Sequence, residues 1–530
     1  MRLGSELTIG RALIPLALLA SIAAVVLIGG PAGAAPRQSA TQPNILMIMT
    51  DDQTTGMLSK ETMPKTIKQI YKNGTDFSQT IITTPTCCPS RASFMTGQFA
   101  HNHGVLENDY GLLRDDTTTL PTWLQAAGYE TIHVGKYLNR YKKTQGATTI
   151  APGWDEFDAA MERYAYYDYA LRLNGKTKRY GDDDEDYLTT VLNGLVIDEI
   201  EDAAPSKKPF YLQYTPYAPH IAPGDDKRCD GAAVPAPEDY ESGLFKDERL
   251  PRPESFNEGD VSDKPSFIQG LKELSQKKID DLERRYGCAL ASLKEVDRGV
   301  GEIMDTLEET GELDNTIVIF VSDNGFFYGE HRIPDAKQNP YEEALRVPMA
   351  MRVPSKYLGG TQQPKRVSQL VANIDVPATI LQFAGGAAPC NVAGNCRTLD
   401  GRSLVPLLQG QTSAYPSDRG FAIELKRIAQ NAPVLGGRSC TYTGIRTPNY
   451  SYAHHTEALN PATRACEPVE DVEWYDLRDD PQQLSSLDGA APGMPQAATE
   501  SALAARSATL ADCAGIQGRD PLPPSGHWCE

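Results

Sequence analysis

Positive charge is scarce in this chain. Its 51 lysine and arginine residues are outnumbered by 70 aspartate and glutamate residues, which gives a formal net charge of -19 over 530 residues. A protein with this charge repels a phosphate backbone, so we expect no nucleic-acid partner. An anionic substrate would have to be held by a few local cations against the overall field. The acidic run at 181–186 is expected to be a solvated loop.

Long hydrophobic runs are almost absent as well. The one long run, 12–28, follows Arg2 and Arg11 and precedes the small residues of 31–35. A basic start, an apolar middle and an Ala-x-Ala end predict a secretory signal peptide over residues 1–35, cut near Ala34. The expected location is therefore secreted or extracellular, with no stable membrane span after cleavage. The alternative is an uncleaved segment that anchors the protein in a membrane.

The sequence contains no Cys-x-x-Cys pair, which disfavours a thiol redox protein. Its ten cysteines include one adjacent pair, Cys87-Cys88, and eight others that are enough for four bridges. Six of the eight follow residue 385, as an oxidised extracellular protein would allow. Sequence proximity suggests three local disulfides: Cys390 with Cys396, Cys440 with Cys466, and Cys513 with Cys529.

Short apolar runs alternate with helical patterns over the first two thirds of the chain. The runs at 44–49, 129–134, 210–214 and 316–321 are typical of buried strands, and 119–127 and 278–309 are typical of helices. This alternation predicts an α/β fold. After about residue 385 the sequence pattern changes to Gly/Ala loops and short β-like segments such as 420–425 and 450–454. We therefore expect a catalytic domain at 43–385 and a smaller, disulfide-rich α+β domain at 386–530 with an Ala/Pro-rich tail.

Oxygen-donor side chains follow two of the predicted strands. Asp51 and Asp52 come directly after the first strand, and Asp323 and Asn324 come after the fourth. In open α/β sheets, ligands bind at the carboxyl ends of the strands. Carboxylate and amide oxygens suit Ca²⁺ or Mg²⁺ rather than zinc. The alternative is that each pair only caps a helix or closes a turn.

Several cationic side chains are predicted to lie at the same edge. Lys136 and His220 each follow a strand, Lys337 follows Asp323 in a loop, and Arg91 and His331 complete the set. Beside a divalent ion, such cations would hold an oxyanion such as sulfate or phosphate. Each could instead be an ordinary surface lysine or a structural histidine.

The adjacent cysteines precede a predicted helix. Pro89 suits the first turn of a helix through Ala92 and Met95, which would place residue 87 at the positive end. From the residues alone, Cys87 could be a thiolate nucleophile, a reduced buried cysteine or one half of a distant disulfide.

The stretch Cys87-Cys88-Pro89-Ser90-Arg91 resembles the Cys-x-Pro-Ser-Arg signature of the type I sulfatases. Further segments resemble the same family in the same order along the chain: 43–53, 96–98, 135–139, 218–220, 322–325, 329–331, Lys337, 341–343, 474–477 and 480–481. The form Lys136-Tyr137-Leu138-Asn139 is similar to the N-acetylglucosamine-6-sulfatases and other glycosaminoglycan sulfatases. Many arylsulfatases have a histidine where this chain has Leu138, which leaves the role of that histidine without a matching residue here.

The resemblance implies an alkaline-phosphatase-like fold. This fold has a large central mixed, mostly parallel sheet sandwiched by helices, plus a smaller C-terminal α+β domain. It also implies that Cys87 is converted to Cα-formylglycine (3-oxoalanine) by the formylglycine-generating enzyme before folding. Cys88 would then remain as a free, buried thiol.

The resemblance also implies a division of roles at the site, with Ca²⁺ favoured over Mg²⁺. Metal ligands would be Asp51, Asp52, residue 87, Asp323 and Asn324. Catalytic residues would be Cys87, Arg91, Lys136, His220 and Lys337. Substrate-binding residues would be Lys136, His220, His331 and Lys337.

The expected activity is hydrolysis of a sulfate ester, carried by a sulfated sugar or an aryl group, to an alcohol and inorganic sulfate. Two alternatives stay open. One is a phosphodiesterase or phosphonate hydrolase of the same superfamily. The other is a non-catalytic protein that binds sulfated glycans.

Overall fold

The computed structural model describes residues 42–530 apart from 147–148, 161–164, 207, 223–242 and 427–436. The predicted signal peptide and Cys229 lie outside the described residues. Within the described part of the chain, no helix is long and apolar enough to cross a membrane. The acidic run ends in a short 3-10 turn, and Asp182 to Glu185 are exposed, as expected for a solvated loop.

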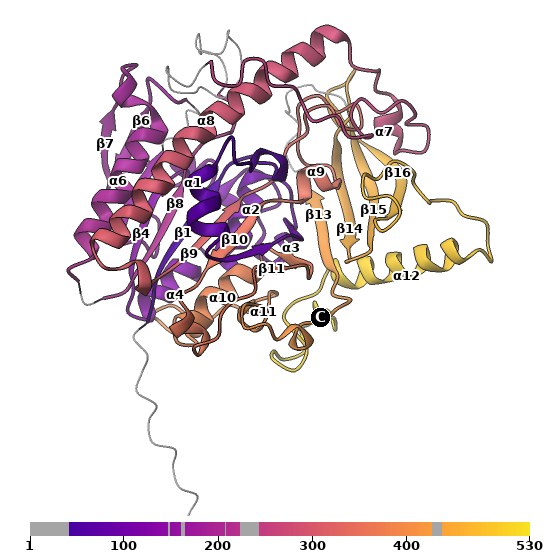
Figure 1. Ribbon diagram of the computed structural model, residues 1–530. Coiled ribbons are helices and arrows are strands. Elements are labelled where there is room, and N and C mark those ends of the chain that lie inside the picture. Colours follow the sequence, from indigo (N-terminus) through magenta and orange to yellow (C-terminus); the bar gives the residue numbers. More distant parts are fainter. Residues whose placement is uncertain (1–41, 147–148, 161–164, 207, 223–242, 427–436) are drawn as a thin grey trace, which may run out of the picture. The chain divides into compact units, whose positions relative to one another are not determined.

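A ten-stranded sheet forms the larger part of the fold, in the order β11-β2-β10-β9-β1-β8-β4-β5-β6-β7 (Figure 1). Its four central strands are parallel and correspond to the predicted apolar runs: β9 (Thr316–Ser322), β1 (Asn44–Thr50), β8 (Phe210–Thr215) and β4 (Glu130–Gly135). The remaining strands are β2 (Thr75–Phe77), β5 (Glu156–Ala160), β6 (Ala170–Leu173), β7 (Lys176–Arg179), β10 (Met349–Arg352) and β11 (Arg366–Val367). β10 pairs antiparallel with β9 and β2, so the sheet is mixed but mostly parallel at its centre.

Strand β1 shows why its sequence is a continuous apolar run. Successive side chains of a strand point to opposite faces, and helices cover both faces here. Leu46 and Ile48 pack in the core formed with α6 (Leu188–Ala203) and α8 (Gln276–Glu309), which lie side by side in Figure 1. Ile45, Met47 and Met49 pack in the opposite core, formed with α2 (Cys87–Thr96), α4 (Leu120–Ala126) and α10 (Asp375–Phe383).

Shorter elements connect these layers. They are α1 (Pro64–Thr66), α3 (Ala100–His103), α5 (Tyr141–Gln145), α7 (Ser266–Gln269), α9 (Glu342–Leu345), α11 (Val405–Leu408), β3 (Thr80–Ile81) and β12 (Val371–Ala372).

A second, antiparallel sheet follows in the sequence, as the change in sequence pattern after about residue 385 predicted. Its order is β13-β14-β15-β16, with bounds Phe421–Lys426, Ser439–Arg446, Tyr450–Asn460 and Ala465–Asp476. Helix α12 (Pro495–Leu510) lies beside this sheet. The composition of this segment predicts only an Ala/Pro-rich tail, whereas the structure forms a helix.

The three predicted local disulfides are confirmed: Cys390–Cys396, Cys440–Cys466 and Cys513–Cys529. Cys288 is also disulfide-bonded. Cys87 and Cys88 are both free and buried, so the structure rules out the distant-disulfide interpretation of Cys87.

Polar contacts tie helix α3 to the C-terminal sheet and to the C-terminal disulfide loop. His101 Nδ1 lies 2.9 Å from Glu424 Oε1 on β13, and its Nε2 lies 3.0 Å from the carbonyl oxygen of Cys513. Asn102 donates hydrogen bonds from Nδ2 to the same carbonyl (2.7 Å) and to Asp400 Oδ2 (2.9 Å). The C-terminal disulfide loop is therefore tied to the helix that directly follows α2.

Candidate active site

The carboxyl ends of β1, β4, β8 and β9 meet at one edge of the sheet and bring distant residues together. Asp51 follows β1, Lys136 follows β4, His220 follows β8, and Asp323 follows β9. Backbone contacts fix this edge, because the Asp323 amide donates to the Thr50 carbonyl at 3.0 Å. The N-terminal end of α2 brings Cys87 to the same place.

Three buried carboxylates form the centre of the site. Asp51, Asp52 and Asp323 each place a carboxylate oxygen so that all lie within 4.8 Å of one another. Asp52 adopts the left-handed region at φ 68°, which breaks the strand alternation and allows consecutive carboxylates to reach one cluster. The amide of Asp52 donates to Asp323 Oδ1 at 3.1 Å.

Asn324 completes an oxygen-donor set. Its Nδ2 donates to Asp52 Oδ1 at 2.5 Å, while its buried Oδ1 has no hydrogen-bond partner among the described residues. A buried acceptor without a donor is costly unless something else binds it. Three carboxylates, together with an amide oxygen that accepts no hydrogen bond, suit a hard divalent cation. The residues predicted as metal ligands are thus together, and their chemistry suits the predicted ion class.

Buried cations balance these carboxylates. Arg91 Nε lies 2.8 Å from Asp323 Oδ2, Lys136 pairs with Asp51, and Lys337 pairs with Asp52 Oδ1. Burial raises the pKa of Asp51, but the cations around it outweigh burial and hold that pKa well below its usual range. Burial and the Asp51 charge raise the pKa of Asp323 to about 6 despite its contact with Arg91. Asp323 therefore accepts a proton more readily than Asp51 does.

Cys87 lies among these charges. Its Sγ is 3.5 Å from Asp51 Oδ1 and 2.8 Å from Lys337 Nζ. Helix α2 begins at Cys87 itself, two residues before Pro89, so residue 87 occupies the positive end as predicted. Burial and the Asp51 charge nevertheless raise the pKa of the Cys87 thiol to about 12. An unmodified Cys87 is therefore protonated at neutral pH, which argues against a simple thiolate nucleophile.

His220 faces the cluster from the β8 side. Its Nδ1 lies 2.6 Å from the Ile221 carbonyl oxygen, so Nδ1 carries the proton that makes this hydrogen bond. Its Nε2 lies 3.7 Å from Asp52 Oδ2. Burial lowers the pKa of His220 to about 4, although both aspartates oppose this effect. The ring is therefore neutral at pH 7, with the Nε2 lone pair directed toward the site.

His331 has a different environment from the other predicted residues. It is fully buried, with Nδ1 2.8 Å from Glu258 Oε2 and Nε2 3.7 Å from Glu343 Oε2, and its ring stacks on Tyr341 at 4.1 Å. Among the described residues, no hydrogen bond or ion pair joins it to the carboxylate cluster. Its predicted role in substrate binding stays a prediction, and its contacts are those of a structural ion pair.

Sequence reasoning missed two groups that position the site. Asn108 Oδ1 accepts a hydrogen bond from the Cys88 amide at 2.9 Å and so holds the first turn of α2. The Lys136 carbonyl accepts from Arg91 Nη1 and from Thr215 Oγ1, both at 2.8 Å. No local pattern marks either Asn108 or Thr215, because their roles depend on contacts between distant segments.

Comparisons with known proteins agree with this geometry. Residues 43–387 match the Sulfatase family, and residues 329–498 match the family described as N-sulphoglucosamine sulphohydrolase, C-terminal. The human N-acetylglucosamine-6-sulfatase is 30% identical over 70% of this chain and 65% of its own length. A putative extracellular sulfatase Sulf-1 homolog from Caenorhabditis elegans is 31% identical over 69% of this chain. The match covers 49% of that relative's own length, so the chain spans about half of it.

A solved structure shows the same fold. That structure is a complex of a protein with its substrate D-glucosamine-2-N,6-O-disulfate. The two chains superpose with a TM-score of 0.68 and are 23% identical, and the match covers 88% of this chain and 96% of that one. This likeness confirms the predicted alkaline-phosphatase-like architecture. With the family match covering most of the described residues, the chain belongs to the sulfatase family.

Proposed function

We propose that this protein is a secreted sulfatase that hydrolyses a sulfate ester of a sulfated sugar. The observation that carries the proposal is the position of Cys87. It lies at the positive end of α2, between the buried Asp51 carboxylate and the Lys337 ammonium group, in a Cys-x-Pro-Ser-Arg sequence. The named relatives act on glucosamine sulfates or are called extracellular sulfatases, which supports the substrate class and the location.

The metal would be held by Asp51, Asp52, Asp323 and Asn324, and we propose Ca²⁺. A divalent cation supplies Lewis acidity toward a sulfate oxygen when bound. The orphaned Oδ1 of Asn324 and the clustered carboxylates support this ligand set.

The modification proposed for Cys87 is conversion to formylglycine, whose hydrate supplies an oxygen nucleophile that the thiol cannot. The thiol is protonated because its pKa is about 12, so the unmodified site lacks a nucleophile at neutral pH. The formylglycine-generating enzyme is the partner that this proposal requires.

Side chains of the protein would stabilise negative charge on the substrate and transfer protons. Lys136 and Lys337 form ion pairs with the aspartates, and their Nζ atoms would stabilise charge on the sulfuryl oxygens. Arg91 orients Asp323, whose raised pKa suits a carboxylate that receives a proton. His220 Nε2 is unprotonated, so it can take up the proton that the nucleophile releases and then donate that same proton to the leaving oxygen.

The first test is the mass of the tryptic peptide that ends at Arg91, taken from protein secreted by its own host. Formylglycine makes this peptide lighter and reactive with hydrazides, and Cys88 then alkylates once as an internal control. A peptide with two alkylated thiols would contradict the proposal.

A kinetic test separates the alternatives. Purified protein is given matched sulfate and phosphonate esters, and a Cys87→Ser variant serves as the control. We expect turnover of the sulfate ester by the wild type and none by the variant. Preferred turnover of the phosphonate would favour a phosphonate hydrolase. Binding of a sulfated sugar without turnover by the modified protein would favour a glycan-binding protein.

A further inference from the structure

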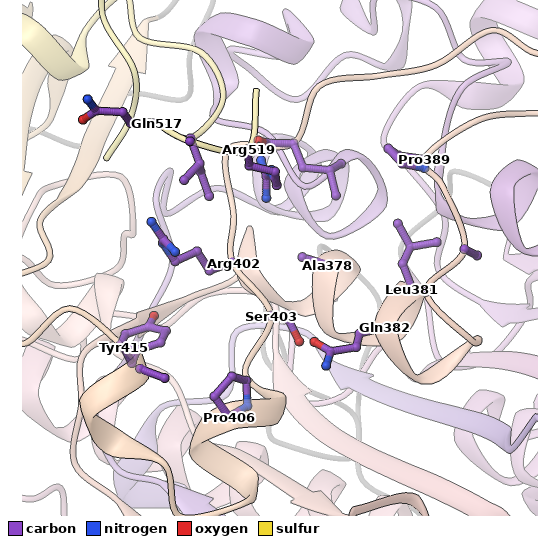
Figure 2. A pocket seen from close by; sticks show the side chains of 16 residues that line it. Ala378, Leu381, Gln382, Pro389, Arg402, Ser403, Pro406, Tyr415, Gln517 and Arg519 are labelled. Atoms are coloured by element: carbon purple, nitrogen blue, oxygen red, sulfur yellow. Dashed lines mark hydrogen bonds between the residues drawn. The ribbon is translucent and has the colours of Figure 1, made fainter. Parts of the chain in front are cut away.

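A second cavity lies away from the carboxylate cluster and shares none of its residues. It has a volume of about 590 Å³ and is bounded by α10, the segment 399–406, Tyr415 and the C-terminal segment 516–519 (Figure 2). Its volume falls within the range of about 300–1,000 Å³ typical of small-molecule sites.

Both charged side chains that line this cavity are cationic. Among its 16 lining residues are two arginines, Arg402 and Arg519, and no aspartate or glutamate, although the whole chain carries a net charge of -19. Figure 2 shows the two arginines in the upper half of the view, with Ser403 and Gln382 in the lower half. Burial lowers the pKa of Arg402 and the neighbouring Arg419 lowers it further, although Tyr415 and Asp375 oppose this effect.

The two arginines differ in how many of their guanidinium donors have a partner within the protein. Arg519 is committed to the protein, because it pairs with Asp520 and donates to the carbonyls of Leu399 and Gly401. Arg402 pairs with Glu530 through Nε only, and neither of its Nη atoms has a hydrogen-bond partner among the described residues. Arg402 therefore offers two donors with the geometry that binds a planar or tetrahedral oxyanion.

A buried aspartate holds the walls in place. Asp375 accepts hydrogen bonds from the Arg402 amide (2.8 Å), from Tyr415 Oη (3.1 Å) and from Arg419 (2.8 Å). The cavity is thus prebuilt, so a ligand loses little affinity to ordering of the protein.

The remaining lining suits a sugar. The carboxamides of Gln382 and Gln517 make no side-chain hydrogen bond among the described residues, while Leu381 and Pro406 supply apolar surface. Hydroxyl groups on an apolar ring need this combination of polar and apolar contacts.

Helix α2 separates this cavity from the active site. The amides of Asp400 and Gly401, next to Arg402, donate to the Gly97 carbonyl at the C-terminal end of α2, at 2.8 and 3.2 Å. Cys87 lies at the other end of this ten-residue helix, which spans roughly 15 Å. A single small sugar cannot reach both places.

We propose that this cavity is a second, non-catalytic site that binds the sulfate group of a sulfated mono- or disaccharide through Arg402. The choice of ligand rests on the proposed function, whereas the presence of an anion site rests on the cavity alone.

Calorimetric titration of the full chain tests this proposal. The Cys87→Ala background prevents hydrolysis, and the probes are glucosamine 6-sulfate, glucosamine and inorganic sulfate. We expect two binding components for glucosamine 6-sulfate. Arg402→Gln should weaken one of them by at least about tenfold, because a charged hydrogen-bond donor is lost. Gln382→Glu, which adds a carboxylate at an exposed position, should weaken the same component without breaking the Glu530 ion pair.

An arginine far from the cavity in sequence provides the control. Arg464→Gln removes the same charge from an exposed turn and should leave both components unchanged. Equal affinity for inorganic sulfate and the sulfated sugar would overturn the assignment of a saccharide. Titrations that Arg402→Gln and Gln382→Glu leave unaltered would overturn the site itself. The active-site component is identified separately by its loss in Lys337→Met, so failure of the proposed function would not be mistaken for failure of this one.

Discussion

The ion pair between His101 and Glu424 predicts a pH-dependent stability. His101 is largely buried, which would lower its pKa, but Glu424 and the Cys513 carbonyl outweigh burial and raise that pKa to about 9. Asp400 acts in the same direction. The pair connects α3 to the C-terminal sheet, so its loss should weaken the attachment of that sheet.

The magnitude follows from the pKa. A rise from an ordinary value of about 6.5 to about 9 corresponds to roughly 3 kcal/mol of folding free energy. Because the folded-state pKa is the higher one, this stabilisation is complete below the unfolded-state pKa. It is lost as the pH rises from about 6.5 through about 9.

Urea unfolding of the wild type and His101→Gln at two pH values measures the effect. We expect the variant to be destabilised by roughly 3 kcal/mol more at about pH 6 than at about pH 9.5. His454→Gln is the matched control, because His454 is only half-buried and pairs with the exposed Glu470 on the same sheet. An equal destabilisation of His101→Gln at both pH values would refute the argument, since a neutral histidine would then account for all of the contact.

Three further predictions concern the site and the C-terminal sheet. Lys337→Met should lower kcat for a sulfate ester by roughly 10²–10³-fold in steady-state assays, whereas the exposed Lys60→Met should not. Chelation of divalent metal should abolish turnover and lower the melting temperature, and Ca²⁺ should restore both better than Mg²⁺; full activity in chelator would contradict the proposed ligand set. Replacing Cys440 and Cys466 by Ala opens a loop with a sequence separation of 26 and should reduce the free energy of unfolding by about 3.5 kcal/mol in urea titrations, so an unchanged midpoint would contradict it.

The central sheet and its polar edge could be predicted because their information is local. A fully buried parallel strand such as β1 is a continuous apolar run, and Asp51-Asp52 marks its end in the sequence itself. Disulfides between close cysteines were predictable for the same reason. Helix α12 was missed although its alanines favour a helix, because the Pro and Gly residues before it suggested a loop.

The environment of His331 could not be predicted from its neighbours in sequence. Its carboxylate partner Glu258 lies 73 residues earlier, and its ring stacks on Tyr341 only when the loop folds back. The same holds for the cavity beside Arg402, whose walls come from α10 and from the last residues of the chain.

The burial of residue 87 means that the proposed modification would compete with folding. Its side chain is 1% exposed and lies under the packed first turn of α2, so an enzyme that modifies this thiol cannot reach it once the sheet has formed. If Cys87 is modified as proposed, each molecule must be modified before it folds, because a folded molecule with an intact thiol would no longer be accessible to the modifying enzyme. Under that proposal, the specific activity of a preparation would depend on the ratio of the modification rate to the folding rate. A variant that folds more slowly should yield a larger active fraction.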